Sequence, residues 1–297
     1  MFPRVAVAAP AAQRPRSRGA LRWGQFVRRS NGASRAAFVF LGLIAAVAIA
    51  PGFVARYDPI QMSPEAVLAP PSPAHPFGTD EFGRDIASRV AYGARTSLGY
   101  AVLATVISTA AGTLIGVTAA YYAGAYDNVV MRAVDVLMAF PGILLALIVV
   151  TLLGPGLTHA MVAVGIGQTP GVGRVVRSAT LGAKSNLYIE ASRAVGGSGA
   201  WIMWRHLLPN IRHVVLVLAT LGYGAAILVG ASLSFLGLGA QPPTPEWGSM
   251  LETARGYLQS DWWVGVLPGI VLGATLLSVN VVGDQLRDIL DPSLRLD

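Results

Sequence analysis

The chain has 297 residues, of which 54% are hydrophobic and only 12% carry a charge. A soluble domain carries about 25% charged residues because it must cover its surface with polar groups. This composition excludes an ordinary soluble protein and favours an integral membrane protein, whose apolar side chains face lipid. The net charge of +7 is interpreted as membrane orientation rather than nucleic-acid binding, because the basic residues lie between apolar segments. With no cysteine, disulfides and thiolate metal sites are excluded.

The first third of the chain is predicted to hold a basic tail, one span and one loop. Residues 1–35 contain eight arginines and no acid, and are expected to form a disordered cytoplasmic tail. Residues 36–55 are apolar and are expected to form a transmembrane helix. A cleaved signal peptide fits less well, because the preceding basic region is long and more apolar segments follow. Residues 56–95, which begin with many prolines, are predicted to form an extracytoplasmic loop.

A short amphipathic helix is expected at the end of that loop. Phe82, Ile86 and Val90 are spaced four residues apart, which places them on one helical face. Asp85 and Arg89 have the spacing of an ion pair on another face. The pattern predicts a helix at the membrane interface or against the bundle.

Five more apolar segments are predicted to form a helical core over residues 96–285. Residues 96–126 carry no charge and exceed the roughly 20 residues that cross a bilayer. Residues 136–173 are also uncharged but too long for one helix, and Gly154-Pro155-Gly156 is expected to divide them. The last two segments are residues 214–238 and 262–282. The sequence therefore predicts an all-α integral membrane protein with six transmembrane helices.

Loop charges predict the orientation of these helices. If six spans are counted, one side of the membrane receives 17 basic residues and the other receives five. Because basic residues collect on the cytoplasmic side, both termini, the tail 286–297 and the loop 174–212 are expected in the cytoplasm.

Glycine pairs recur at helical spacing within the apolar segments. They are Gly112 and Gly116, and Gly269 and Gly273. Small residues at this spacing let helix backbones approach closely in lipid. Both pairs are therefore expected at helix contacts.

The cytoplasmic loop 174–212 has the most informative pattern. It predicts a helix from about Leu187 to Val195, a glycine stop at Gly196 and a second helix around Trp201–Leu207, followed by a proline turn. A short helix held rigidly at the membrane surface is suited to receive force from a soluble partner.

The spacing within this loop resembles a known family. Glu-Ala-Ser, three residues, Gly, nine residues, His, one residue and Leu-Pro is similar to the Glu-Ala-Ala loop of bacterial ATP-binding-cassette (ABC) importer permeases. Ser and His here replace the family's second Ala and its Ile. In that family the loop forms coupling helices that dock onto the ATPases. The resemblance assigns ATPase coupling to Glu190, Ala191, Ser192, Gly196, His206, Leu208 and Pro209.

Other motifs resemble the dipeptide/oligopeptide/nickel permease family, and most closely the second ("C") permease of dipeptide systems. The first motif comprises Gly78, Thr79, Asp80, Gly83, Arg84 and Asp85. The second comprises Gln241, Pro242, Pro243, Glu246 and Trp247, and Asp291-Pro292 follows near the end. The resemblance covers roughly residues 36–296.

This resemblance implies a type I ABC importer permease (MetI-like) bundle in a bacterial cytoplasmic membrane. The implied partners are the lipid bilayer, a second homologous permease, two P-loop ATPases and an extracytoplasmic peptide-binding protein, with no nucleic acid. ATP and Mg would bind the ATPases and no cofactor would bind this chain, which is expected not to be an enzyme. In agreement, Gly182-Ala183-Lys184-Ser185 lacks the Gly-Lys pair of a phosphate-binding loop.

Several alternatives stay open from the sequence. The chain could be an ion- or proton-driven secondary transporter, a membrane anchor without a path, or the same importer with a nickel-complex or glutathione-like substrate. Glu190 could simply pair with Arg193. A metal site is not expected, because no histidine has a partner at ligand spacing. Asp135 and Arg132 are interpreted as surface anchors rather than a proton relay.

Overall fold

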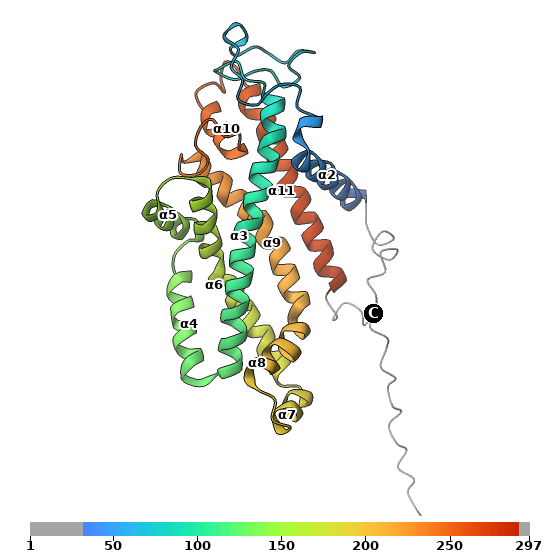
Figure 1. Cartoon of the computed structure of the whole chain (residues 1–297), viewed down its shortest axis with the longest axis vertical. Helices are drawn as coiled ribbons and strands as arrows, with labels where there is room; N and C mark the ends of the chain where they lie inside the picture. The colour runs from blue at the N-terminus through green and yellow to red at the C-terminus, as the bar shows by residue number, and fades with distance from the viewer. Residues whose placement is uncertain (1–31, 291–297) are drawn as a thin grey trace, which may run out of the picture.

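A computed structural model describes residues 32–290, whose regular elements are all helices joined by loops, the longest of them before residue 86 (Figure 1). The long helices are α2 (Gly32–Ile49), α3 (Ile86–Tyr122), α4 (Gly124–Met138), α5 (Gly142–Leu153), α6 (Leu157–Lys184), α9 (Leu208–Phe235) and α11 (Trp263–Leu290). The short helices are α7 (Leu187–Ala194), α8 (Gly199–Ile202) and α10 (Trp247–Ala254). Single turns add η1 (Pro51–Phe53), η2 (Pro64–Ala66) and the π-helical η3 (Met203–Leu207).

Most of the long helices have the length and composition of membrane spans. Within the described residues four segments qualify: α2, α3, the continuous Gly199–Phe235 and α11. A fifth is added if α4 and α5, which meet at a 91° bend, form one span. The predicted all-helical membrane class is confirmed, whereas composition alone does not give six spans. Among the long helices, α6 does not meet the composition of a span, because it carries the polar or charged residues Gln168, Arg174 and Arg177.

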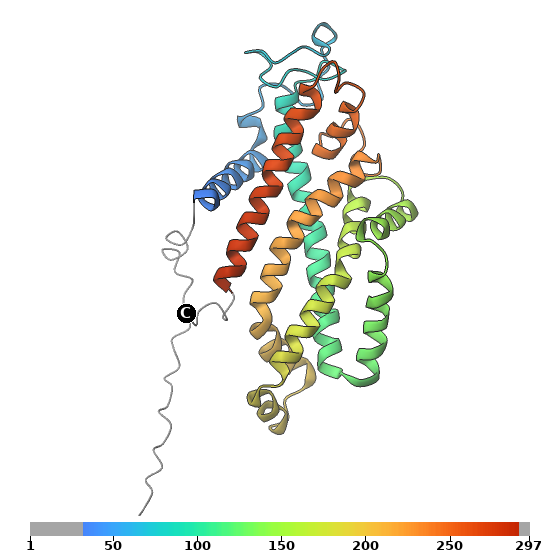
Figure 2. The same cartoon turned by 180° about the vertical axis from the view of Figure 1, so that it is seen from behind.

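The bundle is built around the contact between α3 and α6, with α9 and α11 beside them (Figures 1 and 2). A Cβ added to Gly112 would lie 2.6 Å from Val172, and one added to Gly116 would lie 2.6 Å from the Gly173 carbonyl oxygen. The predicted packing role of this glycine pair is confirmed. The prediction holds only in part for the other pair: a Cβ on Gly269 would lie 3.5 Å from Leu251 of α10, an ordinary contact, whereas Gly273 has nothing within 4 Å among the described residues.

The predicted amphipathic helix is not a separate element. Phe82 lies in a turn and is 47% exposed, and a single helix runs from Ile86 to Tyr122. Asp85 is its N-cap and accepts a hydrogen bond from the Ser88 N–H at 2.7 Å. No breaker follows the cap, so the expected loop end at residue 95 lies inside α3. Arg89 forms its ion pair with Asp80 rather than with Asp85.

The predicted break at Gly154–Gly156 is present, with positive φ at both glycines. A second break that sequence reasoning missed separates α4 from α5 at Ala139–Pro141. Pro141 is extended, with ψ at 131°, and a proline disfavours helical geometry in the residue before it. Residues 127–135, which separate the uncharged segments 96–126 and 136–173, consequently belong to α4.

The first helix also shifts from its predicted bounds. Residues 32–35 belong to α2 rather than to the tail, and the helix ends at Ile49 because Pro51 starts the next turn. The predictions for residues 1–31 and for Asp291-Pro292 fall outside the described residues.

Candidate functional site

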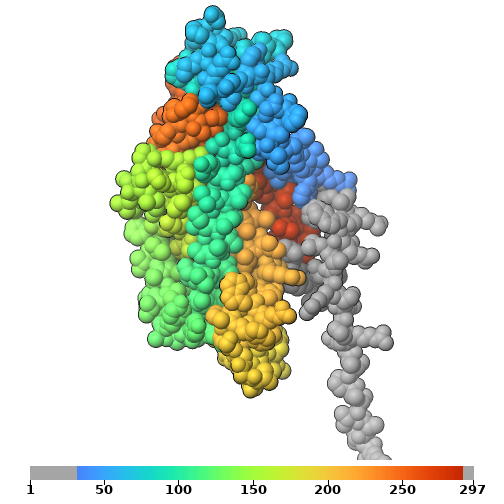
Figure 3. Space-filling model, in the orientation of Figure 1, coloured from blue at the N-terminus to red at the C-terminus, as the bar shows by residue number. Residues whose placement is uncertain are grey.

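Residues Leu187–Leu207, here called the coupling segment, form one tip of the molecule between α6 and α9 (Figure 3, yellow). The loop that precedes α3 caps the other end (Figure 3, blue). The two groups of motif residues therefore lie at opposite ends of the bundle.

The first half of the coupling segment is the helix α7. Gly196 ends it with φ at 88°, a left-handed conformation that favours glycine. The Gly197 N–H donates to the Ser192 carbonyl oxygen at 3.0 Å, which satisfies an end of the helix. The predicted helix and glycine stop are both present.

The second half continues into the membrane helix without a turn. Ser198 caps α8 by accepting from the Trp201 N–H, and η3 then leads directly into α9. The predicted turn at Leu208-Pro209 is therefore wrong. Pro209 lies in the first turn of α9, where a missing N–H costs little, and η3 provides a wider helical turn just before it.

A small core holds the coupling segment against the end of α3. Ile189, Ile202 and Leu207 are fully buried together, with Tyr121 packed against them. The Lys184 ammonium donates to the carbonyl oxygens of Ala120 and Tyr121, both at 2.8 Å. A displacement of the coupling segment must therefore act on the helices that it joins.

The coupling segment exposes apolar side chains and one acidic side chain. Leu187 is 81% exposed and Val195 85%, whereas Trp204, at 68% exposure, lines a groove between α3 and α9. Glu190 is also exposed and forms no ion pair within the described part of the chain, so the alternative pairing with Arg193 is not formed. Arg193 lies over the Tyr121 ring instead. Exposed apolar side chains of this size are typical of a protein-binding surface.

The residues assigned to coupling divide into two groups. Glu190, Ala191, Gly196 and Pro209 are exposed, so a partner could contact them. Ser192 is buried, Leu208 is half-buried, and the His206 ring packs edge-on against Trp201 at 4.7 Å. The Ser192 hydroxyl and His206 Nε2 have no hydrogen-bond partner among the described residues.

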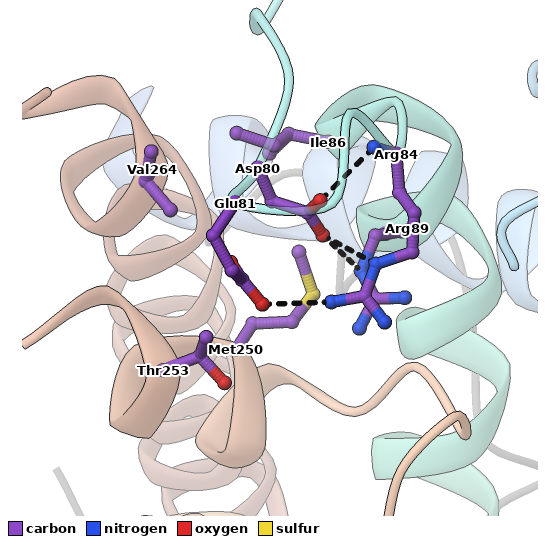
Figure 4. Close-up of a pocket in the computed structure, with 8 residues that line it drawn as sticks. All are labelled: Asp80, Glu81, Arg84, Ile86, Arg89, Met250, Thr253 and Val264. Carbon is purple, nitrogen blue, oxygen red and sulfur yellow. Dashed lines mark hydrogen bonds and ion pairs between the residues drawn. The ribbon is translucent and has the colours of Figure 1, made fainter. Parts of the chain in front are cut away.

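At the opposite end, the motif Gly78–Asp85 folds into a charged cluster above α10 and α11 (Figure 4). The Asp80 carboxylate accepts from Arg84 Nε at 2.7 Å and lies 3.4 Å from Arg89 Nε. Arg84 also donates to Glu81 at 3.0 Å. Gly78 and Gly83 adopt positive φ, and Thr79 accepts from the Ala69 N–H. The motif thus fixes the loop to the end of α3.

The charged cluster is compact and has no room for a substrate. Burial raises the pKa of the Glu81 carboxyl above its ordinary value of 4.5, against the lowering effect of its backbone hydrogen bond. The cavity that the cluster lines with Met250 and Thr253 has about 10 Å³, room for about one water molecule. The cluster is structural rather than a ligand site.

The second motif attaches α10 to α3. Glu246, which is fully buried, accepts from the Gly248 and Ser249 N–H groups and from the Ser97 hydroxyl at 3.0 Å. Trp247 is also fully buried and donates through Nε1 to the Val90 carbonyl oxygen at 3.1 Å. These residues form a helix cap and an aromatic plug.

Gln241 donates to the carbonyl oxygens of Gly237 and Gly239 within its own loop, and the Pro242–Pro243 bond is cis. Sequence reasoning missed Ser97, whose hydroxyl joins both motif residues of α10. It also missed His75, which pairs with Asp85 at 2.9 Å. Neither residue carried a sequence signal: Ser97 lies 149 residues before Glu246, and His75 meets Asp85 only through the fold of the loop between them.

A groove of about 490 Å³ opens between α3 and α9. Thr109 and Thr113 line it and their hydroxyls have no partner among the described residues, while the remaining lining is almost wholly apolar. Polar peptide groups need hydrogen-bond partners when they leave water. The groove alone therefore does not supply a peptide site.

Two ion pairs join α4 to α6. Arg177 donates to both carboxylate oxygens of Asp127, and the distance from Arg177 Nε to Asp127 Oδ1 is 2.6 Å. Arg174 pairs with Asp135. Asp135 is therefore held by a neighbouring helix.

Comparison with known proteins identifies the family of this chain. Residues 112–296 match the family described as binding-protein-dependent transport system inner membrane component. The chain is 44% identical over 274 residues to the glutathione transport system permease protein GsiD of Escherichia coli, covering 92% of this chain and 90% of that one. It is 37% identical over 276 residues to the dipeptide transport system permease protein DppC of Haemophilus influenzae, covering 91% and 94%.

A further relative is DppC of Alkalihalophilus pseudofirmus, 43% identical over 235 residues, covering 79% of this chain and 77% of that one. Among solved structures, a chain from inward-facing conformations of the MetNI methionine ABC transporter aligns with a TM-score of 0.56 at 21% identity. It covers 68% of this chain and 96% of that one, and shows a shared fold. The chain therefore belongs to the binding-protein-dependent transport system inner membrane component family, as a membrane permease subunit of an ABC importer.

Proposed function

We propose that this chain is one of two homologous permeases that form the membrane path of an importer for short peptides. Two separate P-loop ATPases, which would themselves bind ATP and Mg, would dock on the coupling segments of the two permeases. An extracytoplasmic binding protein would deliver the substrate at the opposite end. The observation that carries this proposal is the coupling segment, a rigid tip with an exposed apolar and acidic face. Such a surface is suited to transmit movement from a soluble partner to α6 and α9.

The topology that goes with this function has six spans. We infer that α6 crosses the membrane although it is less apolar than the others. It has 28 residues and packs against α3, α5 and α9, so its polar side chains need not face lipid. With both termini in the cytoplasm, the basic loop 174–212 lies on the same side as the ATPases.

The substrate class follows from the relatives by analogy. Two are named for dipeptide transport and one for glutathione transport, and glutathione is itself a short peptide. We therefore propose a short peptide and keep a glutathione-like or nickel-complex substrate as the alternative within the same class.

The test begins with the tagged chain extracted from its native membrane. Mass spectrometry should find a second permease and two ATPases, and the complex with its binding protein should take up dipeptides after reconstitution. Recovery of the chain alone, without nucleotide-dependent uptake, would contradict the proposal. Competition among a dipeptide, glutathione and a nickel complex then ranks the substrates.

Glu190 provides the sharper test of coupling. Glu190→Lys places a positive charge on the docking face, and like charges at an interface weaken binding. Uptake should fall by about tenfold or more, while the permease pair still assembles. The matched control is Glu65→Lys, an exposed glutamate at the opposite end. Equal uptake in both variants would argue against the coupling role.

A further inference from the structure

Two helices connect the coupling segment to the membrane bundle. The helix α6 ends at Lys184, three residues before the coupling segment starts, and α9 begins directly after its last residue, Leu207. Any movement of the coupling segment is therefore delivered to α6 and α9. How these two helices are joined inside the membrane decides how that movement is divided.

A glutamine joins them near the middle of their length. In the amide orientation that satisfies both ends of its side chain, Gln168 of α6 donates to the Gly222 carbonyl oxygen at 3.3 Å and accepts from the Ala226 N–H at 3.2 Å. Ala226 is fully buried. These two contacts are here called the Gln168 bridge.

The bridge binds the backbone of α9 rather than a side chain. A carbonyl and an N–H four residues apart are each other's partners in an α-helix, so the carboxamide shares one helical hydrogen bond. Gly222 allows this approach, because a Cβ there would lie 3.3 Å from the carboxamide. Glycine also lowers helix stability, so the bridge meets α9 at an intrinsically weak position.

The helix α6 is also weakened close to the Gln168 bridge. Pro170 lies inside α6 two residues after Gln168, and proline removes one hydrogen bond from the helix ladder. On either side of this level α6 is fixed to α3, since a Cβ on Gly165 would lie 2.9 Å from the Ala104 carbonyl oxygen and one on Gly173 would lie 3.3 Å from Ile115. The helix α9 is held to α3 next to the bridge, where the Tyr223 hydroxyl donates to the Leu98 carbonyl oxygen at 3.2 Å, so contacts among all three helices meet here.

We propose that the Gln168 bridge is the pivot about which α9 swings against the α3–α6 pair when the coupling segment moves. Gln168 is then a positioning residue for transport. It sets where α9 bends and keeps the two helices in register while their ends separate. This inference rests on the proposed function, because the movement comes from ATPases bound to the coupling segment.

The test uses the whole reconstituted complex and measures peptide uptake per ATP hydrolysed. Gln168→Met keeps the side-chain volume and removes both hydrogen bonds. Uptake per ATP should fall by about fivefold or more, while ATP hydrolysis and assembly stay close to wild type. Gly222→Ala, which displaces the carboxamide without removing it, should give a smaller loss in the same direction.

The control is Thr169→Val. Its hydroxyl donates only within α6, to the Gly165 carbonyl oxygen at 2.8 Å, so its removal leaves the bridge intact and uptake per ATP unchanged. A purely structural role for Gln168 would lower assembly and hydrolysis together and overturn the pivot. Wild-type values of peptide uptake per ATP in both Gln168→Met and Gly222→Ala would also overturn the pivot.

A second readout separates this inference from the proposed function. The chain has no cysteine, so spin labels at Gly182→Cys and Arg212→Cys report the cytoplasmic ends of α6 and α9 alone. Gln168→Met should broaden their distance distribution, and an unchanged distribution would refute the pivot. A wild-type complex without ATP-dependent uptake would instead refute the importer assignment. The distances between the two spin labels would still show whether Gln168 holds α6 and α9 in place.

Discussion

At the scale of single residues, the motif side chains are mostly structural. Asp80, Asp85 and Glu246 are buried carboxylates whose oxygens accept backbone N–H groups or arginine. Buried charges persist where such partners are present. Their spacing in the sequence reflects the caps and ion pairs that close one end of the bundle. The exposed residues of the coupling segment are the exception, since their surroundings within the chain do not explain them.

Glu81 makes the stability of that closed end depend on pH. Its pKa is raised by burial, so the folded state holds the proton more tightly than the unfolded state. The contribution of Glu81 to stability should therefore be fully present below the ordinary pKa of 4.5 and be lost as pH rises through the window above it. For one proton the slope is at most about 1.4 kcal/mol per pH unit.

Glu81→Gln removes this titration, and thermal unfolding of the detergent-solubilised chain between pH 4 and 7 measures it. The difference in Tm between wild type and Glu81→Gln should shrink on acidification. Glu65→Gln, at an exposed glutamate of the same loop, should keep the wild-type slope. An identical slope in all three proteins would show that Glu81 does not titrate in this window.

At the scale of elements, glycine decides which helices pack tightly. A Cβ on Gly116 would lie 2.6 Å from the Gly173 carbonyl oxygen and 2.7 Å from the Arg177 nitrogen. Both are backbone atoms of α6, which cannot move aside as a flexible side chain would. The contact between α3 and α6 therefore requires glycine at this position.

Gly116→Ala should accordingly destabilise the chain by about 1–3 kcal/mol. Gly273→Ala, where nothing lies within 4 Å, should stay within about 1 kcal/mol of wild type. Thermal unfolding of the two variants compares them directly. A Tm loss of equal size in both would mean that the α3–α6 contact is not the tight one.

At the scale of the whole molecule, the proposed function assigns different partners to the two ends. The coupling segment lies at one tip and the loop before α3 at the other (Figures 1 and 3). The charge distribution predicts that the first tip lies in the cytoplasm. The chain's lack of cysteine makes this orientation directly measurable.

Ala74→Cys and Ala200→Cys put one thiol on each end at exposed alanines. A membrane-impermeant maleimide added to intact spheroplasts should label Ala74→Cys at once, and Ala200→Cys only after permeabilisation. The reverse pattern would invert the topology and place the coupling segment outside the cell, out of reach of ATPases.

The sequence by itself determined the membrane class, the helix of the coupling segment with its glycine stop, and the Gly112–Gly116 contact. These follow from local rules: long apolar segments need lipid, left-handed turns favour glycine, and small residues permit close packing. The family resemblance likewise rested on spacing within short motifs, which the comparisons with known proteins bear out.

Only the tertiary structure decided the features that depend on contacts between distant segments. No sequence pattern indicated that Ser97 joins Glu246 and Trp247, that Arg89 pairs with Asp80, or that the helix continues through Pro209. It also could not reveal the Gln168 bridge, because a glutamine in an apolar helix has no preferred partner until the packing of α6 against α9 supplies a backbone carbonyl and N–H. Local interactions determine where helices form, and the packing of these helices determines which polar groups come into contact.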